Sequence, residues 1–218
     1  MTSKVQLVGL AKATHFGPTI LVTSISFILS LTQTSPLKSL FIALAILAGQ
    51  CTVGWTNDLV DEDRDRSAGR RKKPLVVGSV TAPQLKRAIT IALALATLLS
   101  YLGPLGLKGG SIHMLGLLSA AIYNFGVKGT LFSLLPYAVS FGAMPWAIYA
   151  SVKKSPPAWL WVDFALISIA FHFLNVIKDL EWDRHQSIVG LPQKIGVRGS
   201  QFVAGVCVLA SVVIAFFR

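Results

Sequence analysis

Seven long stretches with almost no charged side chains are the feature that most constrains this chain. Six of them contain no Asp, Glu, Lys or Arg, and the seventh is interrupted only by Asp163. A helix of about 20 such residues is long enough to cross the hydrocarbon core of a bilayer. The stretches are residues 13–37, 39–57, 88–107, 109–127, 129–152, 155–177 and 199–217.

The sequence therefore predicts an all-α integral membrane protein, built as one domain over residues 1–218. We expect a bundle of about seven transmembrane helices with short connections. The alternative is a soluble helical protein with an apolar core. It is disfavoured because only 13% of the residues are charged, too few to cover the surface of a soluble domain of this length. The expected spans lie near residues 16–34, 37–56, 86–104, 110–127, 131–150, 158–177 and 200–217.

The basic residues indicate how the chain is oriented. If the N-terminus lies in the cytoplasm, the cytoplasmic loops and ends hold 15 of the 20 Lys and Arg residues. Because cytoplasmic loops carry the excess of Lys and Arg, we expect the N-terminus inside and the C-terminus outside. The net charge of +11 is then explained by topology and by contact with anionic membrane lipid, and we expect no nucleic acid as a partner.

The acidic residues gather in two of the expected cytoplasmic loops. Eight of the nine lie there, in "NDLVDEDRD" after the second expected span and in "KDLEWD" after the sixth. At 100° per residue, a helix that continued past Asn57 would carry four carboxylates on one face and direct Asp63 away from them. The four are Asp58, Asp61, Glu62 and Asp65.

The second loop repeats this arrangement, since Asp179 and Asp183 are four residues apart and would share a helix face. Carboxylates on one face repel one another unless a cation lies among them. Mg²⁺ binds through a few carboxylates together with phosphate oxygens of a substrate. We therefore predict a Mg²⁺ site on this side of the membrane, with the adjacent "RRKK" contacting a phosphorylated ligand. The alternative for the first loop is a solvated segment whose acids and bases neutralise one another.

These motifs resemble those of the UbiA-type intramembrane prenyltransferases. "NDLVDEDRD" fits the NDxxDxxxD pattern, and "KDLEWDRHQSIVGLPQKIG" is similar to the second DxxxD motif with its downstream G-x-P-x-x-x-G. "KKPLVVGSVT" resembles the basic-Pro-Leu segment that follows the first motif. The order of the motifs along the expected spans is also the same, and the resemblance extends from residue 13 to about residue 200.

The resemblance implies two Mg²⁺ ions that bridge a prenyl diphosphate between the two motif loops. The implied metal ligands are Asn57, Asp58, Asp61, Asp65, Asp179 and Asp183, and the five aspartates are also the implied catalytic residues. Among residues 70–73, one or two basic side chains are expected to reach phosphate. The implied substrate-binding residues are Asn57, Arg71, Lys72, Lys128 and Lys178.

Two positions have more than one interpretation. Lys128 ends "YNFGVK" and resembles a tyrosine–lysine element of the family that contacts diphosphate, but Tyr123 lies one residue farther away than the family's YxxxK spacing. A purely topological role for this lysine is the alternative. His15, in "THFGPT", could line the mouth of the pocket or lie at the membrane interface.

Three functions are compatible with this pattern. The first is Mg²⁺-dependent transfer of an isoprenoid from a prenyl diphosphate to an aromatic or other lipid-soluble acceptor within the membrane. The second is a membrane terpene cyclase of the same family, which needs no acceptor. The third is an ion transporter, which would place acidic residues deep within spans along a path. Family members have about nine spans, two more than expected here. One side of the seven-helix bundle would then lack these two helices, and either lipid or a second copy in a homo-oligomer could cover it.

Overall fold

The computed structural model describes residues 3–185 and 188–218, and all regular secondary structure in these two ranges is helical. The predicted all-α class is therefore confirmed. Within the described ranges, a long helix lies on each of the seven expected segments. These helices are α2 (Phe16–Leu31), α3 (Pro36–Val60), α5 (Ala82–Leu102), α6 (Gly106–Phe125), α7 (Leu135–Ala150), α8 (Ala158–Ile177) and α10 (Leu191–Phe216). The shorter elements are α1 (Ser3–Ala13), α4 (Glu62–Ser67), the 3₁₀ turn η1 (Val127–Gly129) and α9 (Leu180–His185).

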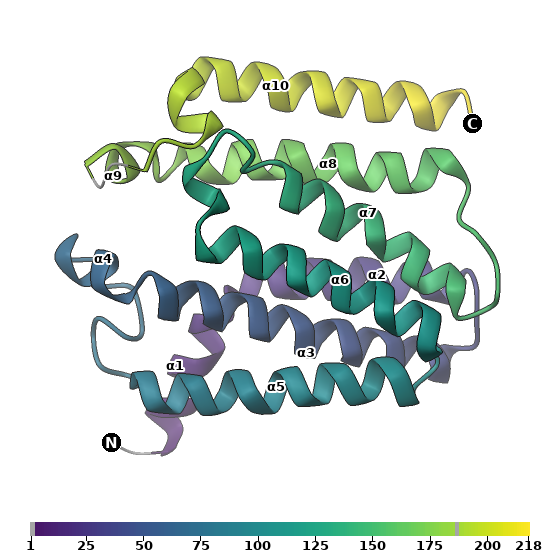
Figure 1. Cartoon of the computed structure of the whole chain (residues 1–218), viewed down its shortest axis with the longest axis horizontal. Coiled ribbons are helices and arrows are strands. Elements are labelled where there is room, and N and C mark those ends of the chain that lie inside the picture. The colour runs from purple at the N-terminus through teal and green to yellow at the C-terminus, as the bar shows by residue number, and fades with distance from the viewer. Residues whose placement is uncertain (1–2, 186–187) are drawn as a thin grey trace. The chain divides into compact units, whose positions relative to one another are not determined.

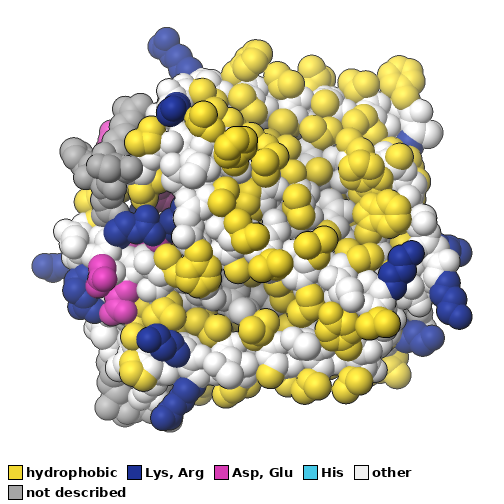
Figure 2. Space-filling view, viewed as in Figure 1, with side chains coloured by type: hydrophobic (Ala, Val, Ile, Leu, Met, Phe, Trp, Pro, Cys, Tyr) yellow, Lys and Arg dark blue, Asp and Glu magenta, His cyan; other side chains and the backbone are white. Residues whose placement is uncertain are grey.

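Several of the long helices have the length and composition of membrane spans. Among the described residues, α3, α5, α8 and α10 each qualify alone, and α1 with α2 qualifies as a pair bent by 67°. On the face shown in Figure 2, hydrophobic side chains cover the long helices, while the charged side chains lie towards helix ends. This distribution is that of an integral membrane protein, and the number of seven spans stays a prediction.

The chain forms two compact units, Met1–Ser111 and Ile112–Arg218, and α6 begins in the first and ends in the second. In the first unit, α3 packs against both α2 and α5 (Figure 1). A small cluster of buried side chains lies where α1, the segment after α4 and the start of α5 meet. Its members are Ala13, Leu75, Val80 and Leu85.

In the second unit, α8 packs against both α7 and α10 (Figure 1). The α8–α10 contact is centred on Ala170, Phe173, Ala204 and Cys207, which are buried together. Hydroxyl groups join α6 to α7. Ser119 donates to the carbonyl of Pro136 at 3.2 Å, and Ser140 donates to the carbonyl of Gly116 at 2.9 Å.

Each unit therefore has the same local plan around its acidic motif. The central helix, α3 or α8, ends at the motif and is followed by a six-residue helix, α4 or α9. The next long helix, α5 or α10, then begins with a proline in its first turn. Proline suits this position because the first helical residues have no intrahelical acceptor for an N–H. The motif carboxylates thus lie at or just after the carboxyl-terminal end of a long apolar helix in each unit.

Candidate functional site

The first motif crosses a break between α3 and α4. Asp61 lies at the break with φ −90° and ψ 0°, but the backbone hydrogen bonds continue through it. The Asp61 N–H donates to the carbonyl of Asn57 at 3.0 Å, and the Asp65 N–H donates to the carbonyl of Asp61 at 2.8 Å. The angular position of each side chain around the helix axis therefore continues almost unchanged from α3 into α4. Asp58 and Asp65 are buried, with 3% and 4% of their surface exposed, whereas Asp63 is exposed.

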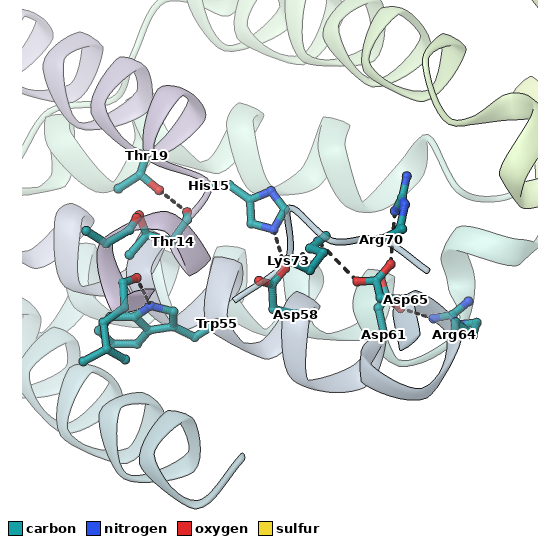
Figure 3. Close-up of polar contacts among 12 residues, drawn as sticks. Thr14, His15, Thr19, Trp55, Asp58, Asp61, Arg64, Asp65, Arg70 and Lys73 are labelled. Carbon is teal, nitrogen blue, oxygen red and sulfur yellow. Dashed lines mark hydrogen bonds and ion pairs between the residues drawn. The ribbon is translucent and has the colours of Figure 1, made fainter. Parts of the chain in front are cut away.

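Lys73 is the cation shared by these two buried carboxylates (Figure 3). Its Nζ lies 2.5 Å from Oδ1 of Asp58 and 3.5 Å from Oδ2 of Asp65. Burial alone would lower the pKa of Lys73, but the Asp58 and Asp65 carboxylates outweigh it and raise the pKa above its ordinary value. The ammonium therefore stays charged at neutral pH and offsets the repulsion between the two carboxylates.

His15 is the second partner of Asp58, with its Nε2 3.0 Å from the same Oδ1 (Figure 3). It lies at the bend between α1 and α2 and has a left-handed backbone, with φ 57° and ψ 60°. This conformation is uncommon for a residue with a side chain. Contacts on both sides hold the bend, because Trp55 Nε1 donates to the carbonyl of Leu10 at 2.9 Å and Thr19 Oγ1 donates to that of Thr14 at 2.7 Å.

Gly54 allows α3 to approach this bend closely. A Cβ atom at position 54 would lie 2.4 Å from the carbonyl oxygen of Thr14, well inside van der Waals contact. Gly54 lies one helical turn before Asp58. The close approach therefore brings the residue after Thr14, which is His15, within reach of the motif.

The arginines around the first motif form further ion pairs. Arg70 Nη1 lies 3.2 Å from Oδ1 of Asp65, and Arg64 pairs with Asp61 one turn away (Figure 3). Arg71 and Lys72, the expected phosphate-binding residues of this segment, are both exposed. In the part of the chain that the structure describes, Arg70 and Lys73 are the members of this basic run that lie against the carboxylates. Their i, i+3 spacing is the only hint of this in the sequence. Asn57 lies half-buried one residue before Asp58.

In the second motif, a helical turn joins the two aspartates. The Asp183 N–H donates to the carbonyl of Asp179 at 2.9 Å, although α8 has already ended at Ile177. Both side chains are half-buried, and Lys178 before them is exposed. Gln193, in the first turn of α10, donates from Nε2 to Oδ2 of Asp183 at 2.7 Å.

Lys128 lies close to the segment that follows the second motif. It is half-buried in η1, and a Cβ atom at Gly190 would lie 2.6 Å from its carbonyl oxygen. The backbone of Lys128 therefore contacts the turn between α9 and α10. The structure thus brings the expected residue Lys128 to the same end of the second unit as Asp183.

A buried polar cluster lies on α8 just before the second motif. His172 Nε2 is 3.1 Å from Oγ of Ser133, and the rings of His172 and Tyr137 are 4.7 Å apart. The Tyr123 ring lies edge-on to both, with centroid distances of 5.1 Å to Tyr137 and 5.7 Å to His172. These contacts attach α6 and α7 to the end of α8 that precedes Asp179.

The donor set suits Mg²⁺, although the described residues form no ready-made cage. In residues 3–185 and 188–218, no group of three or more His, Cys, Asp or Glu side chains is arranged to hold a metal ion. Mg²⁺ does not need one, because it commonly binds through one or two carboxylates, water and substrate phosphates. The ammonium of Lys73 already lies against Asp58 and Asp65 in the way a small cation would. These oxygen ligands therefore fit Mg²⁺.

Comparisons with known proteins place the chain in a family. Residues 18–218 match the family model of the UbiA prenyltransferase family. The structure is similar to that of a UbiA homolog from Archaeoglobus fulgidus bound to GPP and Mg²⁺, with a TM-score of 0.76 and 13% identity over 96% of this chain and 77% of that one. No curated protein sequence matches.

Two other solved structures have the same fold. A UbiA homolog from Aeropyrum pernix K1, solved in its apo form, has a TM-score of 0.69 and 18% identity over 98% of this chain and 78% of that one. A digeranylgeranylglyceryl phosphate synthase has a TM-score of 0.66 and 19% identity over 96% and 76%. These identities are low, so the structures support the fold, and the match over residues 18–218 shows the family. The chain belongs to the UbiA prenyltransferase family.

Proposed function

We propose that this protein transfers an isoprenoid from a prenyl diphosphate to a lipid-soluble acceptor within the membrane, with Mg²⁺ as its cofactor. The observation that carries the proposal is the pair of buried carboxylates, Asp58 and Asp65, held against one cation at the end of an apolar helix. A similar protein from Archaeoglobus fulgidus binds GPP and Mg²⁺, which supports the same ligands here.

The first motif would hold Mg²⁺ through Asn57, Asp58, Asp61 and Asp65, and the second through Asp179 and Asp183. Two ions, as the family resemblance implies, would neutralise the diphosphate and make it a better leaving group. Lys73 and Arg70, which pair with these carboxylates, are candidate cations for phosphate oxygens beside Arg71 and Lys72. Lys128 is the corresponding candidate beside the second motif.

The apolar helices give the isoprenoid tail its environment. Each buried methylene stabilises binding by roughly 0.8 kcal/mol relative to water. The charged head and the acidic motifs would stay at the cytoplasmic surface, while the tail lies among helices. Excluding water from the reacting carbon then favours capture of the allylic group by the acceptor over capture by water.

The test is an assay of the whole chain reconstituted in liposomes. Prenyl diphosphates of several lengths are supplied with Mg²⁺, with and without candidate aromatic acceptors, and products are identified by mass spectrometry. We expect diphosphate release and a prenylated acceptor, both abolished by excess chelator. Ca²⁺ should support less activity than Mg²⁺, because it is larger and prefers more ligands.

The outcomes separate the candidate functions. A hydrocarbon or alcohol formed equally well without acceptor would indicate a terpene cyclase of the same family. Diphosphate release that persists in chelator would contradict the role of Mg²⁺. Cation flux across the liposome without any turnover of prenyl diphosphate would indicate transport.

A further inference from the structure

Gln193 is a buried polar residue that touches the second motif from outside it. Only 7% of its surface is exposed, and its Nε2 donates to Oδ2 of Asp183 at 2.7 Å. The orientation of the amide follows from chemistry, since an ionised carboxylate accepts hydrogen bonds and only the nitrogen can donate one. The amide oxygen must therefore point away from Asp183.

That oxygen, Oε1, has no hydrogen-bond partner among the described residues. A buried acceptor without a donor destabilises a folded protein, because its hydration is lost and not replaced. An apolar residue of similar size would avoid this loss. Among the described residues, the hydrogen bond to Asp183 is thus the polar contact that explains an amide at this buried position.

Gly190 makes room for this amide. A Cβ atom at position 190 would lie 2.7 Å from Oε1 of Gln193 and 2.6 Å from the carbonyl oxygen of Lys128. Its φ is −71°, which any residue can adopt, so space and not backbone freedom requires glycine here. The absence of a side chain lets Gln193 and the loop that carries Lys128 pack against the same turn.

We propose that Gln193 is a positioning residue for Asp183 in Mg²⁺ binding. By holding Oδ2, the amide fixes the rotation of the carboxylate and so orients its other oxygen towards the ion. Hydrogen bonds to metal-ligating carboxylates typically change metal affinity by about 10- to 100-fold. This inference rests on the proposed function, because it takes Asp183 as a metal ligand.

The experiment measures metal binding without turnover. The whole chain in proteoliposomes is titrated with Mn²⁺ in the presence of an unreactive geranyl thiodiphosphate, and bound Mn²⁺ is followed by electron paramagnetic resonance against protein-free liposomes. Gln193→Leu is expected to weaken Mn²⁺ binding by about 10- to 100-fold while its Tm stays equal to or above that of the wild type. Gln201→Leu is the control, because Gln201 is exposed on the same helix, and it should change neither quantity.

A second set of variants tests whether the effect passes through Asp183. In the Asp183→Asn background, Gln193→Leu should have no further effect on Mn²⁺ binding, because the two residues then act as one unit. Equal Mn²⁺ binding by the wild type and Gln193→Leu would overturn the role of Gln193 and leave the proposed function standing. A loss of binding matched by a loss of Tm would also overturn it, in favour of a structural role. A wild-type chain that binds no Mn²⁺ would overturn the proposed function together with this inference.

Discussion

Asp58 and Asp65 lie on either side of one cation, the ammonium of Lys73. Lys73 contacts both carboxylates, and His15 contacts Asp58 from the bend between α1 and α2. A Mg²⁺ ion would compete with these partners for the same oxygens. If Mg²⁺ took these oxygens, as proposed, the ammonium of Lys73 would become available to phosphate oxygens.

Substitution of the buried aspartates should be far more harmful than substitution of their exposed neighbour. Asp58→Asn and Asp65→Asn are expected to lower diphosphate release by more than about 100-fold, beyond the range typical of residues that only orient a ligand. Asp63→Asn is the matched control, since Asp63 lies in the same short helix and is exposed. If Asp63→Asn were as severe as Asp65→Asn, the assignment of the buried face to the metal would be wrong.

Lys73→Met should make the protein less stable and more responsive to Mg²⁺. Two buried carboxylates would lose their shared cation, at a cost of about 1–3 kcal/mol. This is less than for a fully buried pair because the lysine side chain is 20% exposed. Mg²⁺ should restore part of this loss, so the rise of Tm on adding Mg²⁺ is expected to be larger than in the wild type.

Lys72→Met provides the comparison, because Lys72 is adjacent and exposed. Its stability should stay within about 0.5 kcal/mol of the wild type. Thermal unfolding with and without Mg²⁺ measures both variants. An equal response of Lys72→Met and Lys73→Met to Mg²⁺ would contradict the proposed place of the ion.

Among the elements, the contact of α3 with the α1–α2 bend depends on Gly54. Alanine in place of a helix-interior glycine ordinarily stabilises a helix by about 0.5–1 kcal/mol. At position 54, however, the new methyl group would overlap the Thr14 carbonyl, 2.4 Å away, and that atom belongs to the backbone. We therefore expect Gly54→Ala to separate α3 from the bend, lower Tm and weaken the contact between His15 and Asp58.

Gly205→Ala is the control for Gly54→Ala. Gly205 lies inside α10, and among the described residues nothing approaches the position of its Cβ within 4 Å. This substitution should raise stability slightly, as the helix propensities predict. Circular dichroism with heating compares the two variants. A Gly54→Ala protein with unchanged Tm and activity would mean that the α1–α2 bend can move away from α3 without affecting stability or turnover.

For the molecule as a whole, the basic residues predict a cytoplasmic N-terminus and acidic motifs on the same side of the membrane. Single cysteines at Lys72 and Lys154, in a background lacking Cys51 and Cys207, would report this orientation through labelling with an impermeant thiol reagent. Both lysines are exposed. Because cytoplasmic loops carry the basic excess, Lys72→Cys should be labelled only after the cells are opened, and Lys154→Cys in intact cells. The reverse pattern would place the acidic motifs outside.

The sequence alone determined the features that depend on local geometry. Long apolar runs indicated helices that suit a membrane, because a span has to be apolar along its whole length. The helical period distinguished Asp63 from Asp58 and Asp65, since the backbone hydrogen bonds continue across the break at Asp61. In the structure Asp58 and Asp65 are buried and Asp63 is exposed, as the helical period predicts.

Only the tertiary structure decided which residues meet across the chain. Arg71 and Lys72 stay predicted phosphate ligands. That Arg70 and Lys73 lie against the carboxylates could not be predicted, because an irregular loop has no period from which the direction of a side chain can be read. The contact of Gly190 with the Lys128 backbone is likewise non-local. Such contacts depend on how separate helices pack, and the packing is determined by many side chains at once and not by any one motif.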